Sequence, residues 1–79
     1  MERYLLTIVK DKSKNYNKKI DTIRDIVKGD FQLVGTESTM LPEVWLEYYK
    51  VFTEEFRINE LCKIDLVRQI DKLERVFPS

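Results

Sequence analysis

The sequence predicts an α+β domain, with a small β-α-β unit over residues 1–38 and a long or kinked helical arm over residues 39–79. Three observations lead to this prediction. Short apolar runs flank a segment whose apolar residues have helical spacing. The C-terminal half has no Gly or Pro between Pro42 and Pro78. Its apolar residues also keep a single helical phase. The element order is βαβα, or βαβαα if the arm breaks, and 79 residues form one domain.

The first predicted strand covers residues 3–10, where apolar and β-branched residues fill both alternating positions from Tyr4 to Val9. A short run that is apolar on two faces is typical of a strand that is covered on both sides. The second predicted strand covers residues 31–37, which are rich in residues that favour strands. The two strands pair either in parallel or antiparallel, since the sequence favours neither.

A helix is expected between these strands, ending near Lys28. Residues 10–19 form a polar connection into it, and its apolar residues then recur at helical spacing. Gly29 stands where a helix commonly ends in a left-handed residue. The stripe is formed by Ile20, Ile23, Ile26 and Val27.

The helical arm is predicted over residues 42–77, because one apolar arc persists through this segment at 100° per residue. A straight helix of that length spans roughly 54 Å, whereas a compact domain of this size is about 30 Å across. The arm therefore either projects toward a partner or breaks. Thr53-Glu54-Glu55 is the better candidate for a break, and Asn59-Glu60 is the weaker one.

The aromatic residues of the arm suggest a protein partner. Five large rings between residues 45 and 56 exceed what two short strands and one helix can cover. A lone two-stranded sheet is also marginal in water, which favours an isologous homodimer. The leading hypothesis is a small regulatory or inhibitory module that binds itself and another protein. The predicted partner-binding residues are Trp45, Tyr49, Phe52, Phe56, Leu66, Ile70 and Leu73.

Nucleic-acid binding is the alternative, because the connection at residues 10–19 is rich in Lys and contains one aromatic residue. Flexible lysines near a ring can follow a phosphate backbone and stack a base. The zero net charge of the chain gives this alternative no general electrostatic support. Its candidate residues are Lys10, Lys12, Lys14, Tyr16, Lys18 and Lys19.

Catalysis ranks third. The chain has no His, which excludes a Ser-His or Cys-His nucleophile pair, and Cys62 lies on the apolar arc as a small hydrophobe. No Gly-rich phosphate loop or His/Cys metal motif occurs, so no cofactor is expected. If the strands are parallel, Asp11 and Glu37 end at the same sheet edge. Such a pair could hold Mg²⁺ in a nuclease-like enzyme.

The remaining features concern location. A single Cys leaves no intramolecular disulfide, and the apolar run at residues 4–9 is too short for a signal peptide or a membrane span. We therefore expect a cytoplasmic protein with no membrane partner. The abundance of Lys, Asn and Ile is typical of an AT-rich gene from a phage or a low-GC bacterium.

Overall fold

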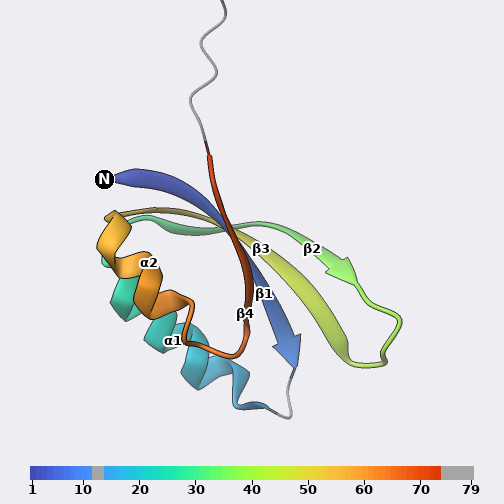
Figure 1. Ribbon diagram of the computed structural model, residues 1–79. Helices are drawn as coiled ribbons and strands as arrows, with labels where there is room; N and C mark the ends of the chain where they lie inside the picture. The colour runs from blue at the N-terminus through green and yellow to red at the C-terminus, as the bar shows by residue number, and fades with distance from the viewer. Residues whose placement is uncertain (12–13, 74–79) are drawn as a thin grey trace, which may run out of the picture.

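A four-stranded antiparallel sheet carries two short helices on one of its faces (Figure 1). The computed structural model describes residues 1–11 and 14–73. The strand order across the sheet is β2-β3-β1-β4, which together with the chain order gives the split β-α-β connectivity often called ferredoxin-like. The elements are β1 (Glu2–Asp11), α1 (Tyr16–Val27), β2 (Phe31–Ser38), β3 (Val44–Thr53), α2 (Glu55–Leu61) and β4 (Val67–Lys72).

The three elements predicted in the N-terminal half are present, but the predicted pairing of its two strands is wrong. The predicted strands at residues 3–10 and 31–37 are β1 and β2, and the predicted helix between them is α1. The two strands do not pair with each other, because β3 lies between them and is antiparallel to both. They therefore run in the same direction, one strand apart.

The end of α1 differs from the prediction at Gly29. The left-handed residue is Lys28, with φ 53°, and no glycine has a positive φ. Gly29 is instead required by a close approach, since a Cβ atom built there would lie 2.1 Å from the backbone oxygen of Phe52. The backbone N–H of Phe52 donates to the oxygen of Asp30 at 3.0 Å. This glycine lets the helix end pass tightly against β3.

The predicted helical arm over residues 39–79 is wrong within the described residues. That segment forms a hairpin loop, a strand of ten residues, a helix of seven residues and a further strand of six. Of the two predicted break points, Thr53-Glu54-Glu55 is where α2 begins, at Glu55, whereas Asn59-Glu60 lies within α2. Cys62, expected among the apolar residues of the arm, is exposed at the end of this helix. Residues 74–79, where the predicted arm ended, lie outside the described part of the chain.

The arm prediction failed because β3 is apolar on both of its faces. One helical arc contains Val44, Trp45, Tyr48, Val51 and Phe52. In the strand, however, Val44, Tyr48 and Phe52 point to one face of the sheet, and Trp45 and Val51 point to the other. When both faces are apolar, the period of two that identifies a strand is hidden. The β-branched and aromatic composition of residues 44–53 was the signal that favoured a strand.

The hydrophobic core lies between the helices and one face of the sheet. Fully buried side chains from the central strand β1, from α1 and from α2 meet there, with Leu6, Ile23 and Leu61 each 0% exposed. Thr53 is buried in the same layer, and its hydroxyl donates to the backbone oxygen of Val27 at 2.8 Å. None of the described helices is long and apolar enough to cross a membrane.

Candidate functional site: the open face of the sheet

The face of the sheet opposite the helices is formed by alternate residues of all four strands. Residues that pair directly across neighbouring strands point to the same side. Both helices lie on one side of the sheet (Figure 1). The pairs Tyr4–Val51 and Leu6–Tyr49 point to the core, so the residues between them point to the opposite side of the sheet. We call this surface the open face. Its residues are Arg3, Leu5, Thr7, Val9 and Asp11 of β1, Val44, Leu46, Tyr48, Lys50 and Phe52 of β3, Gln32, Gly35 and Glu37 of β2, and Gln69 and Asp71 of β4.

The centre of the open face is apolar. Leu5 and Val9 of β1 lie beside Leu46 and Tyr48 of β3, and all four are half-buried although no described helix covers them. An antiparallel sheet with a solvated face normally carries polar residues there. On β3, however, four of the five open-face residues are aliphatic or aromatic. Thr7 lies between these larger side chains and is only 8% exposed.

The rim of the open face is polar. The outer strands contribute Gln32 and Glu37 on one side and Gln69 and Asp71 on the other. The Gln69 amide donates to both carboxylate oxygens of Asp71, at 3.1 and 2.9 Å. An apolar centre with a polar rim is the usual anatomy of a protein–protein interface.

Most charges of the open face separate to opposite ends. Arg3 lies where β1 begins, with its guanidinium 5.9 Å from the centre of the Phe52 ring, and Lys50 pairs with Leu5 on the same half of the face. Asp71 of β4 also pairs with Leu5 and offsets one of these two positive charges. Asp11 and Glu37 lie on the other half. The face is therefore weakly basic at one end and acidic at the other.

One hydrogen bond links the acidic end to the apolar centre. The Tyr48 hydroxyl donates to Glu37 Oε2 at 2.6 Å. This hydrogen bond to a carboxylate raises the pKa of Tyr48, so its hydroxyl stays protonated at neutral pH. The bond fixes the Tyr48 ring along the face, where it can serve as a rigid contact surface.

The residues predicted to bind a partner do not form one surface, because their supposed helical arc is divided between two strands and a helix. Phe52 is on the open face and is 36% exposed. Tyr49 and Leu66 are buried in the core, where the Tyr49 ring stacks on Phe31 with centroids 4.4 Å apart. Ile70 is half-buried on the core side of β4.

The other predicted residues are exposed elsewhere. Trp45 is on the core side of β3 but lies near the hairpin end, and it is 47% exposed. Phe56 projects from α2 and is 58% exposed. Leu73 follows β4, and its backbone N–H donates to the oxygen of Arg3 at 2.9 Å. Leu73 lines one hollow together with Arg3 and Phe52. Of the predicted set, Phe52 therefore belongs to the open face and Leu73 lies at its edge.

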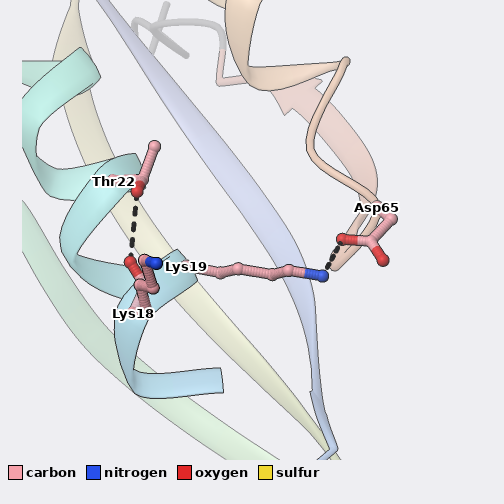
Figure 2. Close-up of polar contacts among 4 residues, drawn as sticks. All are labelled: Lys18, Lys19, Thr22 and Asp65. Carbon is pink, nitrogen blue, oxygen red and sulfur yellow. Dashed lines mark hydrogen bonds and ion pairs between the residues drawn. The ribbon is translucent and has the colours of Figure 1, made fainter. Parts of the chain in front are cut away.

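The lysine-rich segment is partly engaged in contacts within the chain. Lys19 Nζ forms an ion pair with Asp65 Oδ1 at 2.7 Å (Figure 2), and this contact lowers the pKa of Asp65. Lys10 Nζ lies 5.3 Å from the centre of the Tyr16 ring, which is itself buried. Lys14 and Lys18 are exposed, while Lys12 lies outside the described residues. Figure 2 also shows the Thr22 hydroxyl, which donates to the backbone oxygen of Lys18 at 3.1 Å.

A buried carboxylate joins α1 to the core side of the sheet. Glu47 is 5% exposed, and its Oε1 accepts hydrogen bonds from the hydroxyls of Tyr16 and Tyr49. Burial raises the pKa of Glu47, while Lys10 and the Tyr49 hydrogen bond act in the opposite direction. Burial and the neighbouring carboxylate raise the pKa of Tyr49 to about 12. The network orients α1, and the Tyr49 hydroxyl remains a donor at neutral pH.

A hollow of about 310 Å³ opens beside Glu47. Its wall combines one cation, two carboxylates and an indole, contributed by Lys10, Glu43, Glu47 and Trp45, with Thr36 at its edge. This mixture of charges selects no single class of ligand. We therefore assign the hollow no binding role.

The carboxylates considered for Mg²⁺ do lie on the same face and at the same end of the sheet. Asp11 pairs with Val44 and Glu37 with Leu46, so β3 separates the two acidic residues. Two strand spacings are about 10 Å, which is too far for both to ligate one ion directly at about 2.1 Å. Within residues 1–11 and 14–73, no three His, Cys, Asp or Glu residues are grouped to hold a metal.

The sequence analysis missed Leu5, Val9 and Leu46 as site residues. The sequence of β1 could have identified them, because a strand that is apolar on both faces is expected to be packed against other residues on both faces. The described chain covers one side only. No protein-family model, curated protein or solved structure matches this chain.

Proposed function

We propose that this protein is a small protein-binding module whose partner docks on the open face of the sheet. One observation carries the proposal: the two central strands are apolar on both faces, and the helices cover only one of them. Apolar area gains free energy when it leaves water, at about 25 cal/mol per Å². A partner on the open face would supply the cover that the second helix layer of a three-layer fold would otherwise provide.

The polar features of the face support a protein partner over a nucleic acid. Asp11 and Glu37 on the open face would repel a phosphate backbone. In the lysine-rich segment, Tyr16 is buried and Lys19 is paired with Asp65.

The proposal is tested by placing a benzophenone photo-cross-linker at one position of the open face and at a matched position elsewhere. Leu46 lies at the centre of the open face. Leu33 is the same residue type on the neighbouring strand, points to the other side and is 47% exposed. Each variant is irradiated in an extract of the cells that produce the protein. We expect protein adducts from position 46 at about tenfold or higher yield than from position 33.

The composition of the adducts decides between the hypotheses. A cross-link from position 46 to a protein supports the proposal, whether that protein is another copy of this chain or a different chain. Equal yields at both positions would refute it. An adduct at position 46 that is destroyed by nuclease treatment would replace the proposal with nucleic-acid binding.

A further inference from the structure

We infer that the open face is occupied by a second copy of this chain, packed sheet to sheet with the strands of the two copies antiparallel. This inference rests on the proposed function and names its partner. The observations that carry it are the opposite charges at the two ends of the face and the positions of the apolar residues between them.

Two isologous arrangements bring the open faces of two copies together. If the two-fold axis runs parallel to the strands, equal ends meet, so that Arg3 and Lys50 of both copies gather at one end and Asp11 and Glu37 at the other. If the axis lies in the interface and runs perpendicular to the strands, the basic end of each copy meets the acidic end of the other. Like charges across an interface are costly and opposite charges fix its register. The polarity of the face therefore selects the antiparallel arrangement.

The strand register makes β1 self-complementary in this arrangement. With the axis above the pair Thr7–Tyr48, the β1 residues equally distant from Thr7 face each other across the interface. Arg3 of one copy then faces Asp11 of the other, and Leu5 faces Val9. On β3, Phe52 faces Val44, whereas Lys50 faces Leu46, whose neighbour on β2 is Glu37. Lys50 therefore meets its complement by extending along the interface toward that carboxylate.

The size of the face is sufficient for a weak dimer. The central strands of ten residues extend for about 34 Å, and the outer strands of eight and six residues extend for about 27 and 20 Å. At about 4.8 Å per strand, the face covers about 550 Å² per copy. The total of about 1,100 Å² is in the range of weak, transient interfaces. Packed sheets are separated by about 10 Å, a gap that an arginine and a carboxylate can bridge together. We expect a dimer that dissociates on dilution.

Charge reversal tests the arrangement. The acidic variant carries Arg3→Glu and Lys50→Glu, the basic variant carries Asp11→Lys and Glu37→Lys, and the quadruple variant carries all four substitutions. Sedimentation equilibrium at low salt gives the dissociation constant, and circular dichroism checks that each variant is folded. Each double variant should dissociate at least about tenfold more readily than the unchanged protein, because its two ends now have the same sign. The quadruple variant should dimerise again, since its polarity is reversed but intact.

A matched control separates polarity from net charge. Lys18→Glu with Arg24→Glu changes the net charge as much as the acidic variant does, but on α1, away from the open face. It should dimerise like the unchanged protein. A quadruple variant that stays monomeric while the unchanged protein dimerises would overturn the antiparallel arrangement. If the unchanged protein is monomeric at every concentration, the second copy is excluded. A cross-link from position 46 to a different protein would then still support the proposed function.

Discussion

The two faces of the sheet are built from the same strands but are completed differently. On the core side, the helices bury Leu6, Ile8 and Val51, and the buried carboxylate of Glu47 accepts hydrogen bonds from two tyrosine hydroxyls. On the open side, apolar residues of the same strands stay half-buried, between charged ends. The comparison indicates that the core side stabilises the monomer, whereas the open side is available for association. Substitutions at neighbouring positions can separate these two roles.

The largest expected effect comes from the neighbouring leucines of β1. Leu6 is fully buried on the core side, and Leu5 is half-buried on the open face. Leu6→Ala should lower the free energy of unfolding by about 2–5 kcal/mol, since it leaves a cavity in a small core. Leu5→Ala should lower the unfolding free energy of the monomer by less than about 1 kcal/mol but weaken self-association. Urea denaturation of dilute samples and sedimentation of concentrated samples measure the two effects.

If Leu6→Ala does not fold, Leu6→Val provides the same comparison with a smaller cavity. Equal losses of monomer stability for Leu5 and Leu6 would show that the open face is part of the monomer core, which would contradict the division between the faces. Unchanged self-association in Leu5→Ala would count against the open face as the association surface.

A smaller effect on stability is expected from replacing the buried carboxylate of Glu47. Because the pKa of Glu47 is raised in the folded protein, the native state holds this proton more tightly than the unfolded chain does. The associated stability is present below the usual pKa of Glu, about 4.3, and is lost as the pH rises through the raised value. Glu47→Gln should abolish this loss of stability. The number of protons released on unfolding in this pH range should then fall by up to about one.

The same substitution at a surface carboxylate of α2 provides the control for this experiment. Glu60→Gln changes an exposed carboxylate and measures the effect of removing one surface negative charge by itself. Thermal or urea unfolding of both variants between pH 4 and pH 8 compares them. If Glu47→Gln keeps the original pH dependence, Glu47 titrates in the folded protein as it does in the unfolded chain, contrary to the account of its burial.

The sequence predicted the parts of the fold in which one pattern dominates. α1 has a single apolar stripe, and β1 and β2 are short apolar runs bounded by polar residues, so all three were recognised. β3 was mistaken for a helix because its two apolar faces satisfy both periods. α2 and β4 contain too few residues to show a period of their own, and the turn between them contains neither Gly nor Pro.

The position of the candidate site could not be predicted from local patterns. The excess of aromatic residues predicted that some rings would be exposed, and Phe52 is exposed on the open face. Placing the excess on a helix, however, grouped Tyr49 and Leu66, which are buried, with Phe56, which faces another direction. Only the strand register shows that Leu5, Val9 and Leu46 lie together. Local patterns do not contain this pairing across distant segments.

The central claim, that the open face binds a second copy, is tested most directly by nuclear Overhauser contacts between copies in a half-labelled sample. Leu5 and Val9 are four residues apart on one strand, about 14 Å, so a contact between their methyl groups must connect two molecules. The account predicts this contact in concentrated samples, together with one between Phe52 and Val44. A dimer whose contacts between copies come instead from Leu33 or Phe56 would contradict it.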